Sequence, residues 1–246
     1  MLPALTVDSL LLRTVGFVQR LWHWQGPPPP KGVDGSMLWP GKIDSELVTS
    51  RDGLTFARST GRQPLLSVGR DGHWASAFKW AIPRLVYFGD REFLFFAGRN
   101  YNHNLETRRG VEYAPGFRSG IAAAAWRRDG MIALSGDDSY AARREATTLP
   151  LQFGKAGQAV DGWLELNLDT GAGGSCAVEI LDAATRRPLP GLSLAEAVPL
   201  VANSVEARAQ WRGAPSLKSA AGRPVRLRFV LQAAKLFGFR FARAGA

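Results

Sequence analysis

Several features that identify other classes of protein are scarce or missing in this sequence of 246 residues. Its single cysteine, Cys176, excludes an intrachain disulfide, and because free cysteines are among the most buried residues we expect it inside a strand. No run of about eighteen apolar residues marks a membrane span, and residues 1–25 lack the cleavage pattern of a signal peptide. The sequence therefore leaves the compartment unknown, and no membrane partner is expected.

The motifs of several enzyme classes are also missing. The sequence contains no P-loop, no dinucleotide-binding fingerprint and no nucleophile elbow. Its three histidines, His23, His73 and His103, are far apart and do not have the spacing of a catalytic metal site. We therefore expect no cofactor and no metal.

Acidic residues are few, with 21 Asp and Glu against 31 Lys and Arg, so the formal net charge is +10. Such a charge could attract nucleic acid or another polyanion. No recognition-helix pattern, zinc-ligand spacing or RNA-binding consensus accompanies it, and the arginines of residues 224–231 alternate with apolar residues as on a half-buried strand. Specific nucleic-acid binding is not expected, and salt-sensitive polyanion binding remains a lesser alternative.

Short alternating segments and turn signals dominate the rest of the chain and predict an all-β fold. Residues 44–98 hold two pairs of short strands, joined at Asp52-Gly53 and at Gly89-Asp90, which are two-residue turn signals. No helical period of ten or more residues lies between the pairs, which favours consecutive hairpins over a βαβ unit.

The pattern changes near residue 136, where regular alternation begins. Five strands separated by turn signals predict a β-sandwich over residues 136–246. The predicted strands are residues 146–151, 163–168, 177–181, 225–231 and 236–241. Residues 1–35 are predicted to be irregular, with a proline-rich linker at 27–30.

Motifs in the first half of the chain resemble a known family. Ser50-x-Asp52-Gly53-x-x-Phe56 and the following Gly72-x-Trp74 are similar to hairpins of five-bladed β-propeller glycoside hydrolases that carry a C-terminal β-sandwich. The resemblance implies a partial propeller over residues 36–135 whose upstream blades are missing, and it suggests an exported or periplasmic protein. One departure is Ala75, where that family often has an acidic residue.

Propeller glycosidases use carboxylates that project into a central funnel, one as general acid and another as nucleophile or base. The candidates for these catalytic roles are Asp44 and Glu46, near the start of a predicted strand, and Glu106, in the loop after the second hairpin. The ordinary alternative makes Asp44 a turn residue and Glu46 an exposed strand residue.

The candidates for substrate binding combine aromatic rings with hydrogen-bonding groups, as the faces and hydroxyls of a sugar require. They are Trp74, Trp80, Tyr101, Asn102 and His103. Each tryptophan could instead belong to the core of the β structure.

Three functions follow from the sequence. The first is a truncated glycoside hydrolase-like protein that acts on or binds an oligosaccharide or polysaccharide. The second is a noncatalytic glycan-binding or scaffolding protein, and the third is a polyanion-binding protein. An incomplete propeller would also expose open sheet edges, which tend to pair with other chains, so self-association is expected.

Overall fold

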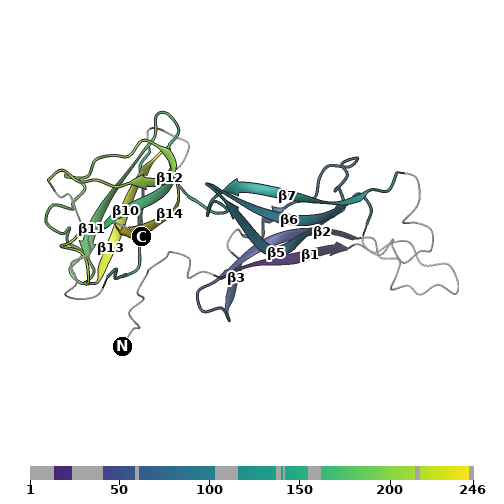
Figure 1. Ribbon diagram of the computed structural model, residues 1–246, viewed down its shortest axis with the longest axis horizontal. Coiled ribbons are helices and arrows are strands. Elements are labelled where there is room, and N and C mark those ends of the chain that lie inside the picture. The colour runs from purple at the N-terminus through teal and green to yellow at the C-terminus, as the bar shows by residue number, and fades with distance from the viewer. Residues whose placement is uncertain are drawn as a thin grey trace. The chain divides into compact units, whose positions relative to one another are not determined.

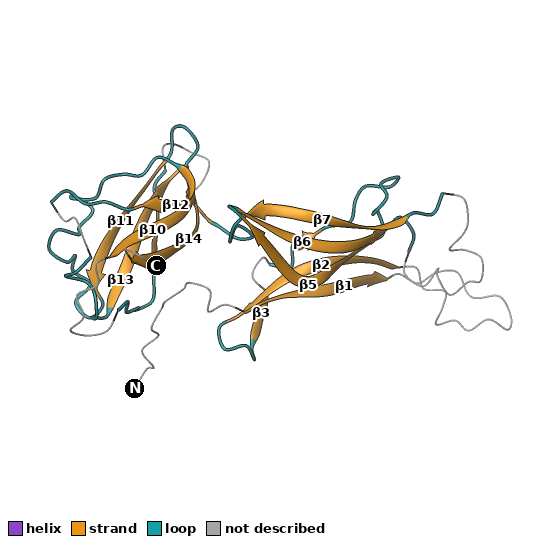
Figure 2. Cartoon of the chain, in the orientation of Figure 1, coloured by secondary structure: helices purple, strands orange, loops and turns teal. Residues whose placement is uncertain are grey.

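The structure is a computed structural model that describes residues 14–23, 41–58, 61–102, 116–136, 140, 142–154, 162–213 and 217–243. Within these ranges every regular element is a strand (Figure 2), which confirms the all-β prediction. The described chain divides into two compact units, an N-terminal unit that ends at Trp126 and a C-terminal unit that begins at Arg127. The sequence placed its boundary near residue 136.

The N-terminal unit contains one mixed sheet in the order β1-β2-β5-β6-β7, and the short strands β3 and β4 also pair with β2 (Figure 1). Its strands are β1 (Thr14–His23), β2 (Gly41–Ser50), β3 (Phe56–Arg58), β4 (Pro64–Leu66), β5 (Phe78–Phe88), β6 (Arg91–Arg99) and β7 (Ser119–Arg127).

Strand β2 is central to this sheet. It pairs antiparallel with β1 along its whole length, from Thr14 opposite Ser50 to His23 opposite Gly41. Its parallel contact with β5 is short and is extended by the Ser45 hydroxyl, which accepts a hydrogen bond from the amide of Ala81 and donates one to the carbonyl of Lys79. The segment expected to be irregular thus contributes a full strand, β1, to the sheet.

The predicted hairpin around Gly89 is present as β5 and β6. Gly89 has φ of 59°, the left-handed conformation that a tight two-residue turn requires and that glycine adopts without steric penalty. The return strand after the predicted turn at Asp52-Gly53 is β3, which begins only at Phe56. An Asx turn at Asp52 occupies residues 52–55, because the Asp52 carboxylate accepts hydrogen bonds from the amides of Leu54 and Thr55.

The main apolar cluster of the N-terminal unit is small. Its buried members are Leu66, Ala81, Leu94 and Phe96, and the partly buried Trp74 packs against them with its ring stacked on Phe96 at a centroid distance of 6.0 Å. The Trp74 ring lies directly over the backbone of Gly98, in β6, so that a Cβ atom added there would lie 2.6 Å from Cζ3 of the indole. Gly98 is therefore required by close packing.

The C-terminal unit contains two sheets, in the orders β12-β10-β14-β8 and β11-β13-β9. Its strands are β8 (Leu134–Ser135), β9 (Arg144–Thr147), β10 (Gly162–Asp169), β11 (Ser175–Asp182), β12 (Asn203–Arg208), β13 (Val225–Gln232) and β14 (Lys235–Arg243). Four predicted strands match β10, β11, β13 and β14 closely, and the fifth overlaps β9. Strand β12 was not predicted.

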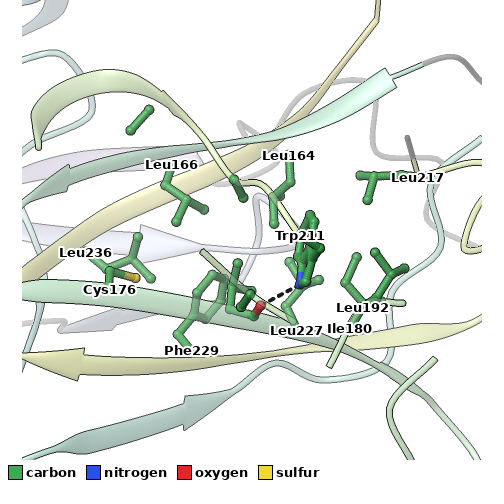
Figure 3. Packing of buried hydrophobic residues seen from close by; sticks show 14 of the residues in the cluster. Leu164, Leu166, Cys176, Ile180, Leu192, Trp211, Leu217, Leu227, Phe229 and Leu236 are labelled. Atoms are coloured by element: carbon green, nitrogen blue, oxygen red, sulfur yellow. Dashed lines mark hydrogen bonds between the residues drawn. The ribbon is translucent and has the colours of Figure 1, made fainter. Parts of the chain in front are cut away.

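Both sheets of this unit contribute to one extended apolar core (Figure 3). Leu164 and Leu166 from β10 and Leu227 from β13 are fully buried in it, as their alternation with polar residues predicts. The indole of Trp211 is also buried and donates a hydrogen bond of 2.9 Å to the carbonyl of Val178. Cys176 is buried in β11 as expected, and burial raises the pKa of its thiol to about 12.

The contact between Trp74 and Gly98 predicts the effect of a single methyl group. Gly98→Ala forces the indole or strand β6 to move, and overpacking of this kind typically costs about 1–3 kcal/mol of unfolding free energy. Gly120→Ala is the matched control, because its Cβ would lie 3.6 Å from the same indole, an ordinary contact. Chemical denaturation of both variants tests this, and an equal stability of the two would contradict the packing.

The turn after β11 predicts a dependence of stability on acid pH. Hydrogen bonds from the Thr185 amide and the Arg223 side chain to the Asp182 carboxylate lower its pKa from 3.8 to about 2. Because the folded pKa lies below the unfolded one, the stabilisation is fully present above about pH 4 and is lost as the pH falls through 2. Asp182→Asn should reduce the fall in melting temperature between pH 4 and pH 2, and an unchanged acid profile would refute this role.

Candidate functional site

Two of the three candidate catalytic acids lie together on strand β2. Asp44 and Glu46 are two residues apart and therefore point to the same face of the strand. Asp44 is 5% exposed and Glu46 is 0% exposed, so neither has the position of a surface residue. The third, Glu106, lies outside the described residues.

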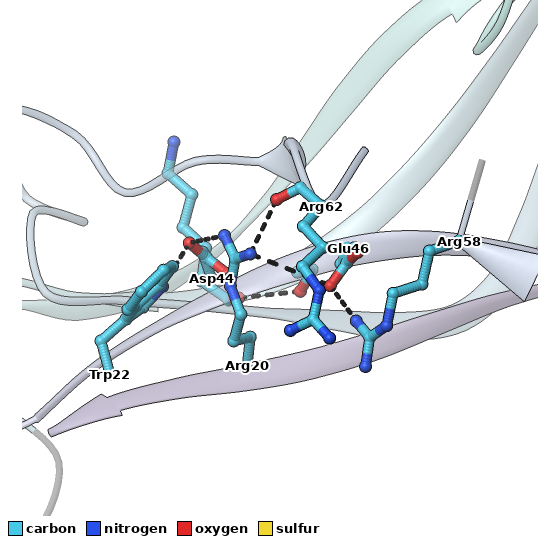
Figure 4. Close-up of polar contacts among 8 residues, drawn as sticks. Arg20, Trp22, Asp44, Glu46, Arg58 and Arg62 are labelled. Carbon is cyan, nitrogen blue, oxygen red and sulfur yellow. Dashed lines mark hydrogen bonds and ion pairs between the residues drawn. The ribbon is translucent and has the colours of Figure 1, made fainter. Parts of the chain in front are cut away.

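Asp44 is held by β1. Arg20 stands directly opposite it, and the guanidinium donates from Nε to Oδ1 at 3.2 Å and from Nη2 to Oδ2 at 3.1 Å (Figure 4). The indole of Trp22 donates a further hydrogen bond of 2.8 Å to Oδ2 and also stacks under the guanidinium, 4.1 Å from the ring centroid. Arg20 completes its contacts by donating to the carbonyl of Arg62 at 2.7 Å. The bidentate ion pair between Arg20 and Asp44 fixes the orientation of both side chains.

Glu46 is held from the other side of β2. Its Oε2 accepts a hydrogen bond from Nη1 of Arg58, in β3, and lies 3.9 Å from Nη1 of Arg20. Its Oε1 is the buried side-chain oxygen that has no hydrogen-bond partner among the described residues. We call Arg20, Asp44, Glu46 and Arg58 the acid–arginine cluster.

The acid–arginine cluster contains two carboxylates and two guanidinium groups, so its charges balance. Buried charges are tolerated when they are paired and hydrogen-bonded, and this pairing connects β1, β2 and β3. A general acid needs a proton to donate, whereas an ion-paired carboxylate has none, and a nucleophile needs a path to the substrate. In this arrangement Glu46 has no exposed surface through which a sugar could reach it.

A second group of side chains joins β5, β6 and the segments next to β6 and β7. Trp80 stacks on Phe78 with ring centroids 5.9 Å apart, and the Arg99 guanidinium lies 4.6 Å from the Phe78 ring and 5.5 Å from the Tyr101 ring. Tyr101 contacts Phe117 at 5.1 Å. We call these five residues the aromatic strip.

The aromatic strip contains two of the predicted binding residues, Trp80 and Tyr101. Trp80 is 44% exposed and Tyr101 is half-buried. Asn102 follows Tyr101 and is half-buried as well. Trp74 is not part of the strip, because its ring packs on Phe96 in the core, and His103 lies outside the described residues.

The sequence did not single out Arg20 and Arg58, the arginines that pair with Asp44 and Glu46. Arg20 lies in a segment predicted to be irregular, and Arg58 follows a turn that is longer than the predicted two residues. The alternation of residues 14–23 was the available signal, since pairing that segment antiparallel with β2 puts an arginine opposite a carboxylate. Phe78 and Arg99, which fix Trp80 and Tyr101 in place, were also not singled out.

Within the described ranges, no group of three or more His, Cys, Asp or Glu residues is arranged to hold a metal ion. The same ranges hold no helix that has the length and apolar character to cross a membrane. Comparison of the chain with models of protein families, with curated proteins and with solved structures gives no match. The likeness to propeller glycoside hydrolases therefore remains an expectation drawn from motifs.

The acid–arginine cluster predicts a large effect of removing one arginine. Arg58→Met leaves the buried Glu46 carboxylate without its principal partner, and breaking a buried pair typically costs about 3–5 kcal/mol. Because Arg58 is itself 41% exposed and Arg20 stays near Glu46, we expect about 2 kcal/mol of unfolding free energy here. Denaturant titration provides the measurement.

Two further variants make this test specific. Removing the carboxylate as well, in Arg58→Met with Glu46→Met, should restore most of the lost stability, since no buried charge is then left unpaired. Arg91→Met changes an exposed arginine of β6 and should stay within about 0.5 kcal/mol of the parent. A double variant that is less stable than Arg58→Met alone would contradict this account, because the Glu46 carboxylate would then not need Arg58 to compensate its burial.

Proposed function

We propose that this chain is a carbohydrate-binding protein of the propeller glycoside hydrolase type, which binds a glycan through the aromatic strip and uses its acid–arginine cluster to hold the sheet. The observation that carries the proposal is the position of Trp80. Trp80 is 44% exposed, and the ring of the buried Phe78 stacks against its indole.

The aromatic strip has the two properties that sugar recognition needs. The first is a fixed aromatic surface on which the apolar face of a sugar ring can stack, and the stacking of Trp80 on Phe78 supplies it without ordering a mobile side chain. The second is a set of hydrogen-bonding groups for the hydroxyls, which the Tyr101 phenol and the Asn102 amide provide. The strip thus suits an oligosaccharide or polysaccharide.

Hydrolysis of a glycosidic bond is the second candidate function. It is favoured by the placement of Asp44 and Glu46 on one face of β2, because glycosidases use two carboxyl groups together. It requires that Arg20 and Arg58 leave the carboxylates and that the side chains covering Glu46 move. Binding without turnover needs no such rearrangement and is therefore the function that the geometry supports best.

The proposal includes the finer architecture. The hairpin-built open sheet of the N-terminal unit is consistent with part of a propeller, and the two sheets around one core in the C-terminal unit are consistent with a β-sandwich.

Polyanion binding through the net charge of +10 can be distinguished from glycan binding by its dependence on salt concentration. The affinity for a polyanion falls steeply between about 50 and 200 mM salt, whereas the affinity of a glycan stacked on Trp80 does not.

The proposed function predicts the result of removing the exposed indole. Trp80→Ala should raise the Kd for a bound oligosaccharide roughly fivefold, since an aromatic contact is worth about 1 kcal/mol. Phe88→Ala is the control, because Phe88 is 79% exposed on the same strand but is not part of the aromatic strip. Calorimetric titration against a panel of plant and microbial oligosaccharides measures both.

The same panel separates binding from hydrolysis. We expect negligible release of reducing sugar from any glycoside, and no change of that background in Glu46→Gln. Robust turnover that Glu46→Gln abolishes would replace the binding function with hydrolysis. Equal loss of affinity in Trp80→Ala and Phe88→Ala would remove the aromatic strip from the binding site.

A further inference from the structure

Strand β7 forms one edge of the sheet in the N-terminal unit. It is bonded to β6 on one side, and no described strand pairs with its other side. A row of main-chain amide and carbonyl groups on a sheet edge is a template for pairing with another strand, and proteins commonly protect such edges with charges, prolines, bulges or short length.

The other edges carry protection of this kind. Strand β8 has only two residues, and β9 and β12 contain charged side chains, among them Glu145 and Glu206. The edge of β11 is partly covered by bridges to Leu200 and Pro188. Strand β1, at the opposite edge of the same sheet as β7, carries Arg20 in its middle.

Strand β7 has none of these features between its first residue and Trp126. Its residues Ser119 to Trp126 include no charge and no proline, in a chain with a net charge of +10. Ala122 and Ala124 face the core of the unit, while Ile121, at 73% exposure, Ala123 and Ala125 lie on the opposite face. The strand is thus long, apolar and open.

The opposite face continues onto the neighbouring strands as an apolar surface. Trp80 stands opposite Ala97, and Val86 stands opposite Phe93, so these side chains share a face across β5 and β6. Phe95, at 40% exposure, lies between them on β6. An apolar run such as that of residues 93–98 is typical of a strand that is covered on both faces, whereas here the described residues cover one.

We propose that β7 pairs antiparallel with β7 of a second copy of this chain, forming a two-fold symmetric dimer with a continuous sheet. A second copy suits this edge because the uncharged span of β7 keeps the like charges of two basic chains away from the contact. The small side chains of Ala122 to Ala125 leave the main chains free to approach. The pairing also joins the two apolar faces side by side.

Charge disfavours one register of this dimer. Pairing that sets Ala123 opposite its own copy would bring Arg118 opposite Arg128, and like charges in opposed positions are destabilising. Pairing that sets Ala122 opposite its own copy avoids this repulsion and brings Arg118 opposite Trp126, a contact between a cation and an aromatic ring. The proposed dimer has this second register, with Ala122 on its two-fold axis and Gly120 opposite Ala124.

The mass in solution tests the proposal. Sedimentation or light scattering across a range of concentrations should show a dimer. The double variant Ala123→Lys and Ala125→Lys should be a monomer, because charges on an edge strand oppose pairing. Both positions are exposed, so the circular dichroism spectrum should remain unchanged. Val18→Lys, at a 38% exposed position of β1, is the matched control and should leave the dimer intact.

Cross-linking tests the register. Ala122→Cys should form an intermolecular disulfide on mild oxidation, because residues opposite each other have Cβ atoms about 4.5–5.5 Å apart, whereas Ala124→Cys should not. The native Cys176 is buried and gives no background. Three results would overturn the proposal. They are a monomer at all concentrations, a dimer that is lost in Val18→Lys but not in the β7 lysine variant, and open-ended assemblies formed by pairing of β1 with β7.

Discussion

The burial of two carboxylates on one face of β2 is the constraint on which the N-terminal unit depends. A buried charge is unfavourable unless another charge and hydrogen bonds compensate it, so Asp44 and Glu46 determine where their neighbours lie. Arg20 must stand opposite Asp44, which fixes the register of β1, because a slip by one residue would turn the guanidinium to the other face. Arg58 must reach Glu46, which positions β3. The same contacts withdraw both acids from the surface, which is why binding on the aromatic strip fits this structure better than hydrolysis.

The two units differ in the size of their apolar cores. The C-terminal unit surrounds a large apolar core with two sheets, and ion pairs such as Arg228 with Glu179 and Arg240 with Glu165 join its neighbouring strands. The N-terminal unit has a smaller apolar core and also depends on the acid–arginine cluster, on the packing of Trp74 over Gly98 and on the bridging hydroxyl of Ser45. Its open sheet leaves aromatic and apolar side chains exposed, and these are the surfaces on which the proposed glycan binding and the proposed pairing of chains take place.

Local patterns predicted much of the fold, and long-range contacts account for what they missed. Alternation identified β10 and β13, and the turn at Gly89 followed from a two-residue signal, because these features depend on neighbours in the sequence. The burial of Glu46 could not be predicted in this way, since it depends on arginines that precede and follow it by many residues. Trp74 was considered for binding or for the core, and only the contact with Gly98, distant in sequence, decides that it belongs to the core. Of the candidate site, the sequence thus identified the exposed Trp80 but not the side chains that fix it.

The most direct test of this account is a crystal structure of the chain with a bound oligosaccharide. The account predicts a sugar ring stacked on Trp80 within hydrogen-bonding distance of Tyr101 or Asn102, while Arg20 and Arg58 keep their contacts with Asp44 and Glu46. A sugar bound against Asp44 and Glu46, with the arginines displaced, would contradict the structural role of the acid–arginine cluster and would place the functional site there instead.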